Sequence, residues 1–126
     1  MTERGLLEAV TEPRRVLVCG GRDYADAEHM ALILNAASID VLIHGAARGA
    51  DSLADDWAKG KGVRVERYPA DWDSHGRAAG HIRNAQMLTM GQPDLVIAFP
   101  GGKGTANMVA QAKAAGVKVV RITNVR

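Results

Sequence analysis

The chain has 126 residues, of which 47% are apolar and 24% charged, a composition that fits one packed domain and excludes global disorder. The formal net charge of +2 is too small to favour nucleic-acid binding by itself. A lone cysteine excludes an internal disulfide, and no apolar stretch approaches the ~20 residues of a membrane span. We therefore expect a cytoplasmic protein with no membrane partner.

In chain order, residues 1–13 predict a flexible polar leader that ends at a proline, and residues 14–126 predict a single domain. Within that domain, short Val-rich runs predict strands and apolar residues at helical spacing predict helices. The predicted strands are residues 15–19, 40–44, 63–68, 94–99 and 117–123. The predicted helices are residues 25–37, 50–62, 78–91 and 104–116.

Strands that alternate with helices predict a parallel sheet with helices on both faces. The fold class is therefore α/β, a Rossmann-like doubly wound sheet of five strands, for which we expect the order 3-2-1-4-5. The continuous apolar runs at 15–19, 40–44 and 94–99 predict the most buried strands. Residues 69–80 are the one long irregular connection, and such loops are often functional.

Three of the strands run directly into loops of small residues, "CGGRDY", "HGAARGAD" and "FPGGKGT". The carboxyl ends of parallel strands share one edge, and the expected order makes these three strands neighbours. The loops should therefore line one crevice. Their glycines would let backbone amides approach an anion, and the helix after each loop would add its free amides. The alternative is that glycines only fit tight strand-to-helix turns.

The spacing matches neither the dinucleotide fingerprint G-x-G-x-x-G nor the P-loop G-K-[ST]. We still expect these loops to bind a phosphate-containing ligand, with Thr105 either capping a helix that begins near Gly104 or bonding a phosphate oxygen. The predicted ligand-binding residues are Gly20, Gly21, Arg22, Asp23, Gly45, Arg48, Asp51, Arg83, Asn84, Pro100, Gly101, Gly102, Lys103, Gly104 and Thr105.

Several polar or aromatic side chains near these loops allow two interpretations each. Asp51 would cap the helix that follows it or accept a hydrogen bond from a ribose hydroxyl. Trp72 would stack on a base or pack as a core residue. Cys19 follows an apolar run and is expected to be a buried small hydrophobe. The single cysteine and four scattered histidines lack metal-ligand spacing, so we expect no metal and no cofactor.

The motifs "VLVCGGRDY", "LIHGAARGADSLADDWA", "AGHIRNAQML" and "DLVIAFPGGKGT" together resemble the SLOG superfamily. This Rossmann-like group includes the Lonely Guy proteins and DNA-processing protein A, and the chain looks most like its small bacterial and phage members of the YspA-like kind. The resemblance spans residues 15–123. It implies a nucleotide or nucleotide-derived ligand at the carboxyl edge of the sheet.

Lonely Guy phosphoribohydrolases carry an arginine on the helix before the PGG strand and a glutamate shortly after the PGG motif. Arg83 matches the arginine, whereas Asn107 or Met108 stands where the glutamate would be. A neutral amide does not act as a base at neutral pH. We therefore favour a nucleotide-binding sensor or sequestering protein and leave open whether it is an enzyme. The alternative is a nucleotide N-glycosidase whose acid is Asp23 or Asp51, with Arg83 as a further catalytic candidate.

A second alternative is single-stranded DNA binding, by analogy with DNA-processing protein A. The near-neutral charge and an aromatic content of 4% make nucleic acid an unfavoured partner. We expect instead a homodimer, because small SLOG proteins commonly pair through helices. The Ala-rich faces of the third and fourth helices, with Met87, Met90 and Met108, would form its interface. The alternative for these methionines, and the commoner role of Met at helical spacing, is that they are core residues of the protomer.

Overall fold

A computed structural model describes residues 13–123, so all but the last residue of the expected leader lies outside the described residues. None of the helices in this range is long and apolar enough to cross a bilayer. The strands are β1 (Arg15–Cys19), β2 (Val41–His44), β3 (Arg64–Arg67), β4 (Leu95–Ala98) and β5 (Lys118–Arg121). The helical elements are α2 (Ala27–Ala36), α3 (Ala50–Lys61), α4 (Trp72–His75), the 3₁₀ turn η1 (Gly76–Ala78), α5 (Ala79–Thr89) and α6 (Lys103–Ala114).

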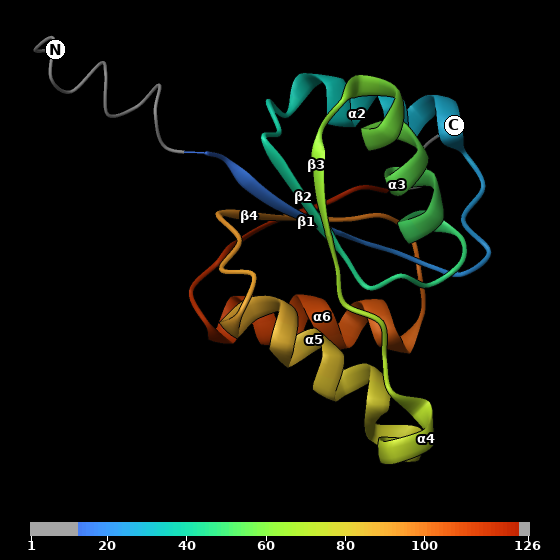
Figure 1. The fold of residues 1–126 in the computed structure, drawn as a ribbon, viewed down its shortest axis with the longest axis vertical. Coiled ribbons are helices and arrows are strands. Elements are labelled where there is room, and N and C mark those ends of the chain that lie inside the picture. Colours follow the sequence, from blue (N-terminus) through green and yellow to red (C-terminus); the bar gives the residue numbers. More distant parts are fainter. Residues whose placement is uncertain (1–12, 124–126) are drawn as a thin grey trace, which may run out of the picture.

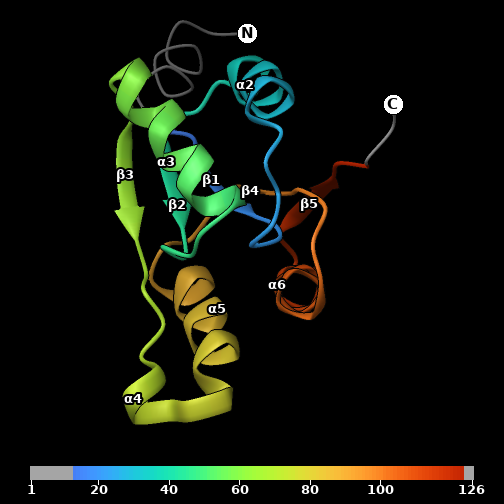
Figure 2. The ribbon, with the colours of Figure 1, turned by 90° about the vertical axis from the view of Figure 1, so that its right-hand side faces the viewer.

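The five strands form one parallel sheet in the order β3-β2-β1-β4-β5, as predicted. Helices α2 and α3 cover one face and α5 and α6 cover the other (Figures 1 and 2). This is the doubly wound, Rossmann-like arrangement that alternating strands and helices predict. Strands β2 and β4 are buried throughout, whereas the edge strands β3 and β5 are partly exposed.

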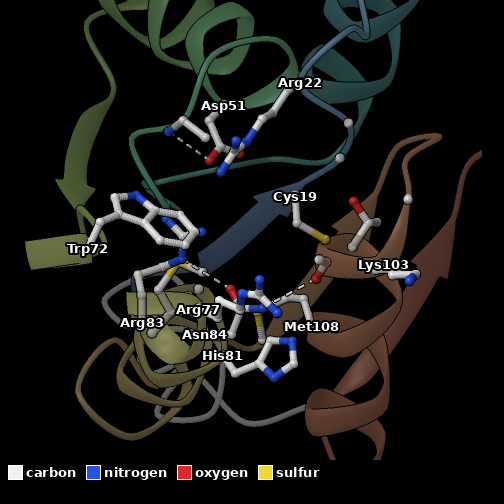
Figure 3. Close-up of a pocket in the computed structure, with 18 residues that line it drawn as sticks. Cys19, Arg22, Asp51, Trp72, Arg77, His81, Arg83, Asn84, Lys103 and Met108 are labelled. Carbon is white, nitrogen blue, oxygen red and sulfur yellow. Dashed lines mark hydrogen bonds between the residues drawn. The ribbon is translucent and has the colours of Figure 1, made fainter. Parts of the chain in front are cut away.

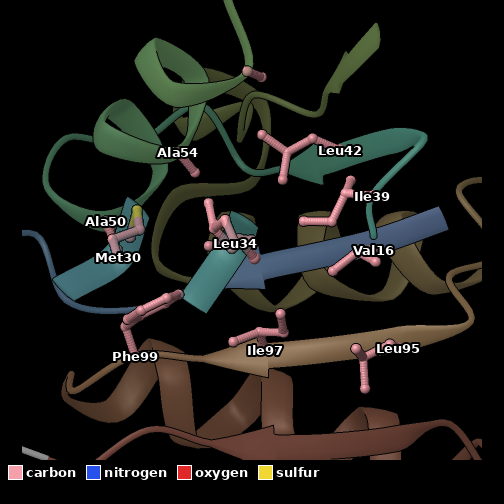
Figure 4. Close-up of a cluster of buried hydrophobic side chains, with 12 residues drawn as sticks. Val16, Met30, Leu34, Ile39, Leu42, Ala50, Ala54, Leu95, Ile97 and Phe99 are labelled. Atoms are coloured by element: carbon pink, nitrogen blue, oxygen red, sulfur yellow. The ribbon is translucent and has the colours of Figure 1, made fainter. Parts of the chain in front are cut away.

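Alternate side chains of the central strand enter two separate cores, because successive strand residues point to opposite faces. Val16 and Val18 pack with α2 and α3, where three alanines of α3 are fully buried and let that helix lie close to the sheet (Figure 4). Leu17 and Cys19 belong to the second core, beneath α5 and α6. The carboxyl end of β1 therefore presents Cys19 to the α5 and α6 side.

The helix boundaries differ from the predicted ones where a local cap decides them. Helix α2 begins at Ala27, two residues later than predicted. The Asp26 carboxylate caps it there by accepting a hydrogen bond from the His29 amide at 3.1 Å. Helix α3 runs through Gly60 and ends at Lys61, because the C-cap Gly62 has a left-handed backbone with a φ of +69°. Helix α5 ends at the C-cap Met90, one residue before the predicted Gly91.

The long connection after β3 is more regular than expected. The Asp71 carboxylate accepts a hydrogen bond from the Ser74 amide at 3.1 Å and so caps the single turn α4. The turn η1 then leads directly into α5. Figures 1 and 2 show α4 beyond the carboxyl end of β3, at the N-terminal end of α5. This corner places Trp72 above the carboxyl edge of the sheet.

Two of the methionines assigned to a dimer interface lie inside the protomer. Met87 and Met108 are 2% and 1% exposed and pack in the core beneath α5 and α6, so the core interpretation is confirmed for both and the interface interpretation is wrong. Met90 is 67% exposed. The homodimer itself stays a prediction.

Candidate functional site

The loops after β1, β2 and β4 converge at Gly21, as the sequence predicts. The Gly21 amide donates to the Pro100 carbonyl at 2.9 Å, and the Gly21 carbonyl accepts from the Ala50 amide at 3.1 Å. One residue of the β1 loop is thus bonded both to the β4 loop and to the start of α3. The three loops form a continuous rim at the carboxyl edge of the sheet.

Some loop glycines are required by this close packing rather than by a ligand. A Cβ on Gly20 would lie 2.6 Å from the Ala50 Cβ, and one on Gly101 would clash with the Thr105 hydroxyl. By contrast, a Cβ on Gly102 or Gly104 would meet nothing within 4 Å. For Gly20 and Gly101, therefore, the alternative is confirmed that glycine is present because the turns are tightly packed. Gly102 and Gly104 leave open space over the start of α6.

A pocket of about 380 Å³ opens inside the rim (Figure 3), within the usual range for small-molecule sites. Its base is apolar and buried, formed by Cys19, Met87 and Met108. Trp72 and Lys103 stand on opposite sides of it in the close-up. The basic side chains that line it are Arg22, Arg77, His81, Arg83 and Lys103.

The pocket gathers most of the predicted residues. Those that line it are Gly20, Gly21, Arg22, Asp51, Arg83, Asn84, Gly102, Lys103, Gly104 and Thr105. Gly45 and Arg48 line an adjoining pocket, and Asp23, Pro100 and Gly101 line a depression on the outer side of the β1 and β4 loops. Sequence reasoning missed Arg77, whose only signal was its place in the long connection 69–80.

Helix α6 presents a bare N-terminus to this pocket. It begins at Lys103, earlier than predicted, and its N-cap is Gly102, with no side-chain cap and no acidic residue in the first turn. Thr105, which is buried and lines the pocket, therefore lies inside the helix and does not cap it. The first-turn amides and the helix dipole both favour an anion at this end.

Asp51 does not cap α3, because Gly49 occupies the N-cap without a side-chain bond. The Asp51 carboxylate instead points back at the β2 loop, where Oδ2 accepts from the amides of Gly45 and Ala47, each at 3.2 Å. Within residues 13–123, Oδ1 makes no hydrogen bond. Burial raises the pKa of Asp51, although these two amides and the charge of Arg83 oppose that shift.

Arg83 ties α5 to the β2 and β3 loops. Its Nη1 donates to the carbonyls of Gly45 and, at 3.5 Å, of Tyr68, and its Nε donates to Asn84 Oδ1 at 3.1 Å. Burial lowers the pKa of Arg83, and the charge of Arg22 adds to this, while the charge of Asp51 opposes the shift without cancelling it. The guanidinium is held as a cation at the mouth of the pocket, with Nη2 left without a protein acceptor among the described residues.

Neither residue at the position of the Lonely Guy glutamate provides an acid. Asn107 Oδ1 accepts from Asn84 Nδ2 at 3.1 Å and from Gln111 Nε2 at 2.7 Å, so this amide bridges α5 and α6. Met108 lines the apolar base of the pocket. Burial and the Asp51 charge raise the pKa of the Cys19 thiol to about 12, which keeps it protonated and a poor nucleophile.

A second charged cluster lies under the β2 loop and does not line this pocket. His44 Nδ1 accepts from the Ala46 amide at 2.9 Å, so the ring carries its proton on Nε2 and donates to Asp55 Oδ1 at 2.8 Å. Arg67 and Lys59 also bind the Asp55 carboxylate, at 2.8 and 3.1 Å. Burial alone would raise the pKa of Asp55, but these three partners outweigh it and lower the pKa.

No cluster of three or more His, Cys, Asp or Glu side chains in the described part of the chain is placed to hold a metal ion.

The comparisons with known proteins agree with the fold and the loops. The chain is similar to Gene 61 protein of Mycobacterium phage D29, with 39% identity over 119 residues that cover 85% of this chain and 94% of the phage protein. Residues 14–75, which include the β1 and β2 loops, match the model of the YspA, cpYpsA-related SLOG family. This chain therefore belongs to the YspA, cpYpsA-related SLOG family.

Proposed function

We propose that this protein binds a nucleotide or a nucleotide-derived small molecule at the carboxyl edge of its sheet, as a sensor or sequestering protein. The observation that carries the proposal is a pocket of about 380 Å³ with an apolar base, into which a bare helix N-terminus and several cations face. Such a combination suits a ligand with one anionic end and one apolar, aromatic end. The family membership supports the same class of ligand.

The phosphate would bind at the start of α6. Gly102 and Gly104 leave the first-turn amides uncovered, and Lys103 adds a full positive charge beside them. The apolar base of the pocket, formed by Met87 and Met108, would face the nucleoside. Asp51 Oδ1, which lacks a protein donor among the described residues, is available to accept from a ribose hydroxyl.

Calorimetry and thermal unfolding with AMP, ADP-ribose, NAD and cyclic dinucleotides test this proposal. A ligand at 100 times its dissociation constant should stabilise the protein by about 2.7 kcal/mol. The Lys103→Gln variant should weaken binding, whereas Lys113→Gln, which removes an exposed charge from the last turn of the same helix, should not. The proposal fails if no member of the panel binds, or if the two variants behave alike.

A second candidate function, hydrolysis of a nucleotide N-glycosidic bond, is favoured by one observation. Asp51 is a buried carboxyl group in the pocket with a raised pKa, the property required of a general acid. It would donate its proton to the departing base as the glycosidic bond breaks. Water would then add its hydroxyl to the ribose carbon, and the proton released by that water would return to the Asp51 carboxylate, giving the free base and ribose 5-phosphate. Asp23 does not suit this role, because its side chain is 98% exposed and lies outside the pocket.

Chromatography of the products distinguishes the two functions. If the protein is a hydrolase, it should release free base from AMP, Asp51→Asn should abolish the release, and Asp23→Asn should retain it. A protein that binds AMP and returns it unchanged after prolonged incubation is a binder, and the hydrolase candidate is then rejected.

A further inference from the structure

A second pocket, of about 440 Å³, adjoins the first at the carboxyl edge of the sheet. The two share Arg22, Ala47, Trp72 and Arg83, so they are neighbouring parts of one depression. Arg48 lines only the second pocket, and Lys103 lines only the first. The second pocket therefore has three arginines in its lining, and no carboxylate lies among its lining residues.

The guanidinium groups of these arginines are largely uncommitted. Arg22 has no hydrogen bond or ion pair within residues 13–123 and stands over the Trp72 ring, 5.5 Å from its centroid. Arg48 has one loose partner, Asp23 at 3.7 Å, and both side chains are highly exposed. Arg83 uses Nε and Nη1 on the protein, which leaves Nη2. Three arginines around a pocket that has no carboxylate in its lining favour an anionic ligand, because the exposed Arg48–Asp23 pair is loose and Asp51 lines only the first pocket.

The Arg22–Trp72 pair forms the boundary between the two pockets. Its cation–π contact is worth only about 0.5–1 kcal/mol at an exposed site, so a ligand displaces it at little cost. The Trp72 ring is about half exposed. An aromatic surface is thus available where the two pockets meet.

From this arrangement we propose that the ligand carries two separated phosphate groups, one at the start of α6 and one among Arg22, Arg48 and Arg83, with its base against Trp72. The proposal rests on the proposed function and narrows its ligand class to nucleoside bisphosphates and dinucleotides. A mononucleotide whose single phosphate lies at the start of α6 places no anion in the second pocket, where Arg48 lies.

Calorimetry with AMP, adenosine 3′,5′-bisphosphate and the 5′-phosphorylated dinucleotide pApA tests this inference. At least one of the two-phosphate probes should bind about tenfold more tightly than AMP or better. Arg48→Gln should remove that advantage and leave AMP affinity within about twofold, because this arginine lines only the second pocket. Lys103→Gln should weaken all three probes. Lys118→Gln, a charge-matched change at an exposed β5 residue that lines neither pocket, should alter none.

Two-phosphate probes that bind no more tightly than AMP would overturn the inference and leave the proposed function standing. An Arg48→Gln variant that keeps the advantage would do the same. Failure of AMP and of both two-phosphate probes to bind would overturn the inference together with nucleotide binding at the first pocket. If single-stranded DNA binds more tightly than either two-phosphate probe, the inference is overturned and the ligand is a nucleic acid.

Discussion

Two groups of charged side chains lie near the carboxyl edge of this sheet, and they differ in how their charges are satisfied. In the group around Asp55, one carboxylate receives His44, Arg67 and Lys59 at 2.8–3.1 Å. The group around the pockets contains four arginines, of which Arg22 has no acceptor in the described range. The first group has all its partners within the protein, whereas in the second, among the described residues, Arg48 has only the loose partner Asp23 and Arg83 keeps Nη2 unused.

This difference separates charges that stabilise the fold from charges that serve a ligand. A buried carboxylate with all its donors fixes the β2 loop, because His44 also holds the Ala46 amide. Arg22 and Arg48 contribute little to the folded state, whereas Arg83 joins α5 to the β2 and β3 loops. Asp51 falls between the two groups, with one oxygen bonded to the β2 loop and the other free of any protein donor in the described range.

The largest effect should come from removing the carboxylate at the centre of the satisfied group. Asp55→Ala leaves the buried His44 Nε2–H without its acceptor, and this should lower the free energy of unfolding by about 2–3 kcal/mol. Urea unfolding measures it. Asp56→Ala, a change at the neighbouring exposed residue of the same helix, is the matched control and should fall within about 0.5 kcal/mol of the parent. Similar losses in both variants would contradict the distinction.

The same carboxylate should give the protein an acid-sensitive stability. Because the folded pKa of Asp55 lies below its ordinary value of about 3.9, its contribution is complete above that value and is lost as the pH falls below it. As the pH is lowered from about 5 to the lowest value at which both proteins fold, the stability difference between the parent and Asp55→Ala should therefore shrink. A difference that stays constant with pH would show that the charge of Asp55 is unimportant.

Asp51 should respond in the opposite direction. Its pKa is raised by burial, so its ionised form costs stability, a cost that is absent below the unfolded pKa and complete above the folded pKa. Asp51→Asn keeps an oxygen acceptor for the two loop amides and removes the charge. We expect about 1 kcal/mol more stability at pH 7, a gain that disappears toward pH 4, together with weaker nucleotide binding. A less stable variant at pH 7 would show that the loop requires the negative charge.

The smallest change in stability should follow removal of the unsatisfied cations. Arg48→Gln and Lys103→Gln should each alter the free energy of unfolding by less than about 0.5 kcal/mol, because both side chains are exposed and neither has a close protein partner. Thermal unfolding without ligand measures this. Losses above about 1 kcal/mol would place these residues in the structural group.

The strand order and the convergence of three loops followed from sequence alone, because Val-rich runs and the small residues after them are local patterns. What the sequence did not reveal depends on tertiary geometry. The role of Asp51 depends on a loop in which Ala46 adopts a φ of +57°, unusual for a residue other than glycine. Arg77 reaches the pocket only because Asp71 caps α4 and turns the chain toward α5.

The amide bridge between α5 and α6 has a consequence for how the pocket accommodates ligands of different size. Asn84, Asn107 and Gln111 fix the spacing of these two helices, and Gly21 fixes the β1 and β4 loops to each other. The α5 and α6 walls and the β1 and β4 loops are therefore held to one another by hydrogen bonds. A larger ligand would be accommodated instead at the short α4 turn. The Trp72 indole there is exposed, and it can change its rotamer without breaking a hydrogen bond of its own in the described structure.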